Sequence, residues 1–376
     1  MIPVSEPLLQ GRETEYVAEC LRTGWISSSG RFIEAFENAW AGYCGRRFGV
    51  AVSNGTVALQ LAVAALGIGT GDEVIMPTFT IISCALAVIY AGATPVLIDA
   101  DPGTWCMDAR QVEAKITSRT RAIMPVHIYG HPVDMDPLLR LAKRYGLAVI
   151  EDAAEAHGAE YRSAESDHRG WRRCGGFGNA SCFSFYANKL VTTGEGGMVV
   201  TDDEPLARRL RSLRNLAFEP GRRFLHRDLG FNFRLTNIQA AIGLAQVEQI
   251  EATVDRKRAI GHRYAAALAG VPGVRLQADR GWARSVYWMN GLVLDRTTGL
   301  DAPALAERLR SLGVDTRPFF VGMHRQPALL ERGLCGGESY PVADDIAEQG
   351  LYLPSGVGLT DELVDAVIRA TEEALR

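Results

Sequence analysis

Short apolar segments of strand length alternate with helix-length segments from residue 72 onward. Strands are expected at residues 73–77, 94–98, 121–127 and 147–150, and helices at 83–91 and 137–145. Continuous apolar strands separated by helices are typical of a parallel or mostly parallel sheet that helices cover on both faces. The pattern therefore predicts an α/β fold with a large sheet.

The rest of the chain predicts helices before this region and a second unit after it. Helices are expected at 11–23, 31–45, 56–66, 202–213, 238–250 and 251–269. Pro272 and Gly273 interrupt the helical pattern. A strand at 287–294 and helices at 302–312 and 360–375 then indicate a smaller α+β unit. We expect a large domain over residues 1–250 and a small C-terminal domain over 251–376.

Three groups that could take part in binding or catalysis follow predicted strands. Asp152 comes after the strand at 147–150, and Lys189 follows an apolar run that begins at Phe183. Gly55 and Thr56 begin a helix after the apolar run 50–52. Ligands of parallel sheets collect at the carboxyl ends of the strands, so these groups are expected at one site.

Each group has a specific capability. A lysine at a strand end can form a Schiff base with a carbonyl compound, and the Gly-rich turn at 193–197 lets backbone approach a ligand closely. A Gly-Thr pair at a helix start offers N–H groups and a hydroxyl to an anion. Simple N-capping by Asn54 or Thr56 is the alternative, and both interpretations can hold together.

Composition excludes several classes of protein. The chain has 376 residues with 47% hydrophobic and 22% charged residues, and a net charge of −4 argues against a dedicated nucleic-acid binder. No apolar run has the roughly 20 residues of a membrane helix, and residues 1–7 lack a signal-peptide pattern. The seven cysteines are scattered without Cys-x-x-Cys pairs. We expect reduced thiols in a cytoplasmic protein and no metal site.

Pyridoxal phosphate is the cofactor that these groups suit. It needs a lysine, a carboxylate that keeps its pyridine nitrogen protonated, and ligands for its phosphate. Lys189 and Asp152 could supply the first two. Gly55, Thr56 and Ser184 offer N–H and O–H donors for the phosphate.

Six ordered motifs resemble one family. They lie at residues 25–32, 54–56, 124–130, 150–159, 183–197 and 230–234, and together they span essentially the whole chain. The chain is similar to the nucleotide-sugar aminotransferases of the DegT/DnrJ/EryC1/StrS family. The resemblance implies the type I fold of pyridoxal-phosphate aminotransferases, with a mostly parallel seven-stranded sheet and a smaller C-terminal α+β domain.

The resemblance also implies roles for the cofactor site. Lys189 would carry the Schiff base and shuttle a proton, and Asp152 would pair with the pyridinium nitrogen. Glu155 would lie near the ring hydroxyl, with capping of a helix as its structural alternative. Ile81 stands where the family usually has an aromatic residue that stacks on the ring, so it would cover the ring by dispersion alone.

Phosphate contacts come from two subunits in this family. Thr56, Ser184 and the Gly55 backbone would bind the phosphate within one chain. Asn232 would reach the phosphate of the neighbouring subunit, so the active unit is expected to be a homodimer with sites at the interface.

Substrate contacts are implied at five positions. Arg234 would meet the carboxylate of the amino donor, with a surface ion pair as the alternative. His324 would contact the sugar nucleotide, or be structural. Trp25, Ser27 and Arg31 belong to a Ser- and Gly-rich loop that would also contact the sugar nucleotide, or else be a solvent loop. The polar segment 160–178 is expected to be an exposed loop, longer than usual for the family.

The expected reaction moves an amino group from L-glutamate to a keto sugar nucleotide, with GDP-4-keto-6-deoxymannose as the expected acceptor. A 3-keto sugar, or a dTDP or UDP carrier, stays open. A sugar 3-dehydratase of the same fold is a second interpretation, but that branch has histidine where Lys189 stands. A non-catalytic regulatory protein is the third, and it predicts loss of the lysine or the aspartate.

Overall fold

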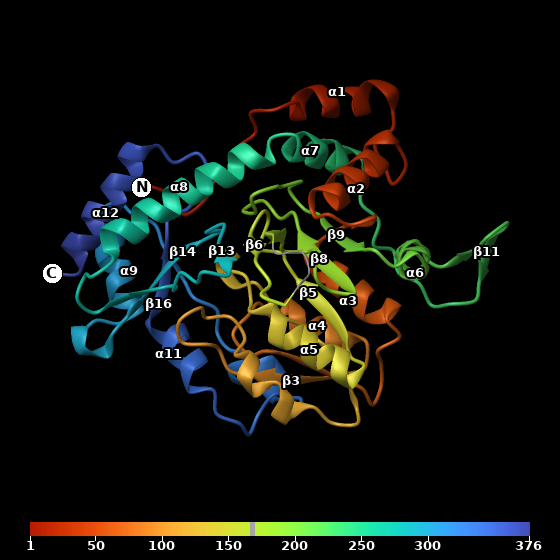
Figure 1. Ribbon diagram of the computed structural model, residues 1–376. Coiled ribbons are helices and arrows are strands. Elements are labelled where there is room, and N and C mark those ends of the chain that lie inside the picture. The colour runs from red at the N-terminus through yellow and green to blue at the C-terminus, as the bar shows by residue number, and fades with distance from the viewer. Residues whose placement is uncertain (166–169) are drawn as a thin grey trace.

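The computed structural model describes residues 1–165 and 170–376. Within these residues, a seven-stranded sheet with the strand order β1-β9-β8-β5-β4-β2-β3 forms the centre (Figure 1). Its strands are β1 (Phe48–Val52), β2 (Glu73–Pro77), β3 (Thr94–Ile98), β4 (Thr120–Ile123), β5 (Ala148–Asp152), β8 (Ala180–Ser184) and β9 (Gly197–Thr201). The pairings from β3 through β8 are parallel, whereas β9 runs antiparallel to both β8 and β1. The predicted mostly parallel sheet is confirmed.

Helices bury this sheet, which explains why its strands are mostly apolar. Both β2 and β9 are buried along their whole length. The helices are α1 (Glu13–Thr23), α2 (Arg31–Tyr43), α3 (Gly55–Ala65), α4 (Ser83–Tyr90), α5 (Met135–Tyr145), α6 (Glu204–Arg214) and α7 (Asn237–Val247). In Figure 1, α1, α2 and α7 pack together on one side, and α4 and α5 lie on the opposite side. Short 3-10 helices lie at Ala109–Gln111, Glu113–Lys115, Ile128–Gly130, Arg296–Thr298 and Met323–Arg325.

The C-terminal part builds its own antiparallel sheet, with the order β12-β14-β16-β15 in the described residues. These strands are β12 (Val274–Leu276), β14 (Asn290–Leu294), β15 (Arg317–Pro318) and β16 (Gly350–Leu353). The accompanying helices are α8 (Ile250–Leu268), α9 (Ala302–Ser311), α10 (Pro327–Leu330), α11 (Pro341–Gln349) and α12 (Asp361–Ala374). A separate hydrophobic cluster that includes Tyr264, Leu305 and Val364 holds part of this unit together. The division into domains at residues 250 and 251 stays a prediction.

The strand predicted at 287–294 starts later than expected. Tyr287 has φ 49°, in the left-handed region that aromatic residues rarely adopt, so regular extended structure cannot include it. The strand β14 begins at Asn290. The turn before it leaves Trp288 on the wall of a cavity described below.

The prediction of an exposed loop at 160–178 was wrong in part. Its first two residues form β6 (Glu160–Tyr161), which pairs with β7 (Arg172–Arg173) further along the same segment. The strand β13 (Ala283–Arg284) pairs with β6 from a distant part of the sequence, which no local pattern could show. Tyr161 is buried. Residues 166–169 of this segment lie outside the described residues.

A hairpin of β10 (Phe218–Glu219) and β11 (Arg222–His226) extends away from the body of the molecule (Figure 1). Phe224 and Leu229, on and after this hairpin, are largely exposed. Among the described residues, no helix is both long enough and apolar enough to cross a bilayer.

Candidate active site

One cavity of about 620 Å³ collects most of the residues that were predicted to hold the cofactor. Asp152 at the end of β5 and Ser184 at the end of β8 both line it, as does Lys189 in the turn that follows β8. The start of α3 supplies Gly55 and Thr56. The other predicted residues on its wall are Ile81 and Glu155.

Lys189 points its amine at an acid and at an aromatic ring. Its Nζ lies 3.8 Å from Oε1 of Glu155 and 3.7 Å from the centroid of the Trp288 ring. Burial lowers the pKa of Lys189, and the negative charges of Glu155 and Asp152 oppose that shift. An amine whose proton is held less tightly than usual is suited to act as nucleophile and base.

Glu155 is held by a backbone group. Its Oε2 accepts a 2.7 Å hydrogen bond from the backbone N–H of Tyr129, in the 3-10 helix Ile128–Gly130. Glu155 thus accepts from a backbone N–H whose residue has left-handed φ/ψ (φ 55°), and its place beside the ring hydroxyl stays a prediction. Burial raises the pKa of Glu155 while the charge of Lys189 lowers it, so the two groups compete for a proton.

Asp152 is held by two hydrogen bonds. Its Oδ1 accepts from the Ala154 N–H at 3.0 Å, and its Oδ2 accepts from the thiol of Cys84 at 3.1 Å. Burial raises the pKa of Asp152, and the Cys84 and Ala154 hydrogen bonds and the charge of Lys189 lower it in part. The protonated pyridine nitrogen of a bound pyridoxal phosphate would favour the ionised form of this carboxylate.

The start of α3 is held close to the end of β8. Asn54 caps this helix, because its side-chain oxygen accepts from the Val57 N–H at 3.0 Å. A Cβ on Gly55 would lie 2.6 Å from the Cβ of Ser184, so only glycine lets the helix start approach Ser184 this closely. Thr56 Oγ1 lies 2.8 Å from Ser83 Oγ. The helix start and its hydroxyls form a neutral cradle suited to a phosphate.

These features test the fit of pyridoxal phosphate to the chain. An amine, a buried carboxylate and a phosphate cradle line the same cavity. The close approach at Gly55 leaves helix N–H groups and the Ser184 hydroxyl side by side. The residues present therefore fit this cofactor.

The remaining predicted residues lie elsewhere in the single chain. Asn232 is exposed and does not line the cavity, and Arg234 donates to Oδ1 of Asn215 at 2.7 Å rather than to a carboxylate. Trp25 is 58% exposed, and the Ser27 carbonyl accepts from the Asn237 N–H. Arg31 forms an ion pair with Glu19.

A second groove brings part of this set together. Arg234 and the loop residues Ser28 and Ser29 line a hollow of about 800 Å³ that also holds Arg211 and Arg214. The arginine predicted to bind the amino donor and the loop predicted to bind the sugar nucleotide are therefore neighbours, although they lie outside the cavity of Lys189.

His324 lies outside both hollows. Its Nδ1 is 2.8 Å from Oγ1 of Thr78, and its Nε2 is 2.9 Å from Oδ1 of Asp344. The side chain is buried and both nitrogens are engaged. This geometry favours the structural alternative for His324 over contact with a substrate.

Several residues of the cavity were not singled out from the sequence. Trp288, Ser83, Phe320 and Tyr352 line it, and Cys84 touches Asp152 from behind. Ser83 and Cys84 lie in a predicted helix next to Ile81, which was a usable signal. Trp288 and Phe320 come from the C-terminal part, and nothing local marks them.

One group of potential metal ligands occurs in the described chain, formed by His127, Glu151 and Cys174. The Glu151 oxygens already accept from His127, the Ser181 hydroxyl and three backbone N–H groups. His127 Nδ1 accepts from the Val133 N–H. Since these lone pairs are in use, we interpret the group as a structural network next to Asp152, whose carbonyl accepts from the His127 N–H.

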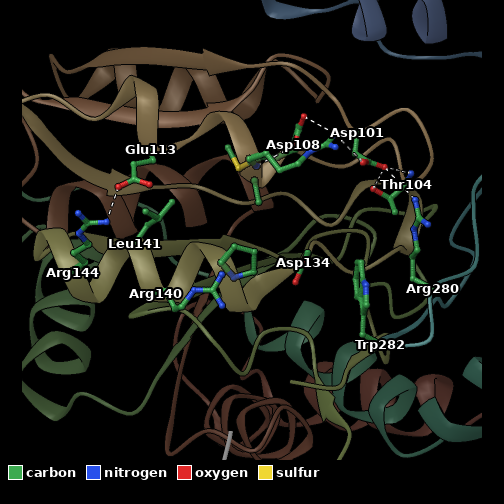
Figure 2. Close-up of a pocket in the computed structure, with 14 residues that line it drawn as sticks. Asp101, Thr104, Asp108, Glu113, Asp134, Arg140, Leu141, Arg144, Arg280 and Trp282 are labelled. Carbon is green, nitrogen blue, oxygen red and sulfur yellow. Dashed lines mark hydrogen bonds and ion pairs between the residues drawn. The ribbon is translucent and has the colours of Figure 1, made fainter. Parts of the chain in front are cut away.

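Figure 2 shows another cavity, of about 620 Å³, between α5 and the segment 101–113. Its arginines are matched by acids. Arg110 pairs with Asp108, Arg144 with Glu113, and Arg140 with Glu165, while Arg280 lies 3.8 Å from Asp101. Because these arginines are paired with carboxylates, the cavity has little electrostatic attraction for an anion.

Comparisons with known proteins agree with this geometry. The profile of the DegT/DnrJ/EryC1/StrS aminotransferase family matches residues 7–372. A GDP-perosamine synthase of Caulobacter vibrioides is 45% identical over 100% of this chain and 98% of its own length. A GDP-perosamine synthase of Escherichia coli O157:H7 is 42% identical over 99% and 98%. Among solved structures, DesV of S. venezuelae superposes with a TM-score of 0.89 at 38% identity, covering 97% of this chain and 94% of that one.

Proposed function

Since the chain belongs to the DegT/DnrJ/EryC1/StrS aminotransferase family, we propose that it transfers the amino group of L-glutamate to GDP-4-keto-6-deoxymannose, giving GDP-perosamine. The protein is a pyridoxal-phosphate-dependent sugar aminotransferase. The observation that carries the proposal is the meeting of Lys189, Asp152 and the Gly55 cradle in one cavity. Full-length similarity to GDP-perosamine synthases supports the choice of sugar.

When bound, pyridoxal phosphate supplies an electron sink for the carbanion that transamination requires. Lys189 Nζ removes the proton from Cα of glutamate, and it moves a proton at C4 of the sugar in the second half of the reaction. Asp152, through its ionised carboxylate, would keep a proton on the ring nitrogen of the bound cofactor. Gly55, Thr56 and Ser184 would hold its phosphate, and Ile81 would contact the ring by dispersion.

The presence of Lys189 separates this reaction from its alternatives. The resemblance implies histidine at this position in the related dehydratases, and a regulatory protein could dispense with the amine. Here the lysine is present and lies 3.8 Å from Glu155, in a cavity lined by the residues that suit the cofactor. We therefore favour transamination.

The direct test is a glutamate-dependent assay across GDP-, dTDP- and UDP-linked keto sugars. We expect the purified protein to be yellow and glutamate to bleach its visible band. The GDP-linked 4-keto-6-deoxy sugar should then react with the highest kcat/KM. A dTDP- or UDP-linked sugar that reacts faster would contradict the proposed substrate but not the aminotransferase chemistry.

We propose that the working unit is a homodimer and that Asn232 completes the site of the partner. In one chain Asn232 is exposed and lies outside its own cavity. Arg234 lines a separate groove together with Ser28 and Ser29 of the 25–31 loop, as expected for residues that serve the partner's site. These residues would then contact phosphate, glutamate and sugar across the interface.

A two-tag heterodimer tests this arrangement. One subunit carries Lys189→Ala and the other Asn232→Asp, each of which should inactivate its own homodimer. If Asn232 acts across the interface, one of the two sites is fully wild type, and the heterodimer should show about half of wild-type activity. A heterodimer as inactive as both parents would place Asn232 in its own subunit's site.

Cys84 gives a prediction about Asp152. Cys84→Ala removes the thiol that donates to Oδ2, so kcat/KM should fall about tenfold, in line with one lost hydrogen bond to a charged group. Cys84→Ser keeps a donor and should stay much closer to wild type. Steady-state kinetics checks both variants, and an alanine variant that is folded and fully active would rule out the effect.

A further inference from the structure

The ring of Trp288 lies directly against the amine of Lys189, and nothing in the sequence motifs assigned it a role. The centroid of the ring is 3.7 Å from Nζ. We propose that the face of Trp288 binds the ammonium form of Lys189, and that Lys257 is a positioning residue that fixes the indole for this contact. The proposal deepens the function above and rests on Lys189 being the reactive amine.

The indole is tied to the same turn that carries the lysine. Its Nε1 donates to the carbonyl of Asn188 at 2.9 Å, and Asn188 immediately precedes Lys189. Trp288 is only 4% exposed, so few other positions are open to the ring. The indole and the amine of Lys189 are therefore held in a fixed relative position, unlike two side chains that move independently.

Lys257 holds the backbone of Trp288 from α8. Its Nζ donates to the carbonyl of Trp288 at 2.7 Å and also to the carbonyl of Ser355. The side chain is buried, and burial lowers its pKa to about 7. A buried amine that donates to two carbonyls acts as a clamp between α8, Trp288 and the segment after β16.

The same face of α8 shapes the turn before Trp288. Gly261 lies one helical turn after Lys257, and a Cβ there would come within 2.2 Å of the Tyr287 ring. Tyr287 itself has φ 49°. Gly261 thus leaves room on α8 for the Tyr287 ring, and Lys257 on the same face holds Trp288. These two contacts explain how the strained conformation of Tyr287 is maintained next to the cavity.

The contact has a measurable electrostatic consequence. An aromatic face attracts a cation, and the attraction strengthens when water is excluded. Among the described residues, Glu155 and Asp152 face Lys189 and favour its ammonium form, and the buried His157 lies near it. Glu6 and Lys257 line a small hollow together with Lys189. Removing the ring should therefore lower the pKa of Lys189 by about half a unit to one unit.

The chain is well suited to measuring this shift, because it contains only four lysines: Lys115, Lys143, Lys189 and Lys257. Trace acetylation of the full chain freed of cofactor, followed across pH and quantified by peptide mass spectrometry, gives a titration curve for Lys189. The exposed Lys143 serves as the internal reference. No turnover is needed, so the result is independent of which sugar reacts.

We expect the Lys189 curve to move to lower pH in Trp288→Leu and to move less in Trp288→Phe, which keeps an aromatic face. Trp282→Leu, in the cavity of Figure 2, is the matched control and should leave the curve unchanged. A folded Trp288→Leu protein with the wild-type curve would overturn the proposal, even if transamination were observed.

Lys257→Met tests the clamp separately, with Lys143→Met as its control. Loss of the clamp should move the Lys189 curve in the same direction as Trp288→Leu, and by less. An unchanged curve in folded Lys257→Met would remove Lys257 from the proposal. The Lys257→Met variant also provides the deciding measurement if Trp288→Leu does not fold. If none of the tested keto sugars reacted but the Lys189 titration curve still shifted, only the proposed sugar substrate would be contradicted.

Discussion

Lys189→Ala is expected to abolish the visible absorption of the purified protein and to lower the rate of transamination by about a thousandfold or more. The variant loses both the amine that bonds to the cofactor and the base that moves the proton. The Lys189 side chain is only 10% exposed and faces Glu155 and Trp288. Among the described residues no other lysine lines the cavity, so none could substitute. Absorption spectra and single-turnover kinetics with glutamate check both parts.

The matched control is Lys143→Ala, which removes an exposed lysine on α5. It should keep the colour and rate of the wild type. A Lys189→Ala protein that retained the full visible band and full activity would refute the assignment of the reactive amine.

Asp152→Asn should give the second largest loss, about a hundredfold or more in kcat. The amide has nearly the same shape and can still accept from the Ala154 N–H, but it has no charge to keep the ring nitrogen protonated. The loss should therefore appear in kcat more than in cofactor content. Kinetics with saturating cofactor and a spectroscopic pH titration distinguish a loss in kcat from a loss of bound cofactor.

Asp279→Asn makes the same change at an exposed position and serves as the control. It should leave kcat unaltered. If Asp152→Asn retained wild-type kcat with cofactor bound, the carboxylate would have no role at the ring nitrogen, and the chemistry proposed for this site would need another acid.

The central sheet and the core of the site could be predicted from the sequence because their signals are local. Continuous apolar strands require cover on both faces, and the pattern of β2 and β5 shows this directly. Asp152 ends such a strand and Lys189 follows one, and the carboxyl ends of strands meet at one edge of the sheet. Gly55 was recognisable as the start of a helix near a strand end.

Contacts between distant segments were out of reach. Trp288 arrives at Lys189 through a left-handed turn at Tyr287 and a clamp from Lys257, and none of these shows a periodic pattern. The pairing of β6 with β13 joins segments that lie far apart along the sequence. His324 was carried over by resemblance, whereas its two nitrogens are engaged by Thr78 and Asp344.

The most direct test of the central claim is to reduce the yellow protein with borohydride and map the modified lysine by peptide mass spectrometry. The chain offers four candidates, and we expect the cofactor to be found on Lys189 alone. Cofactor attached to Lys115, Lys143 or Lys257, or to no lysine at all, would contradict the claim.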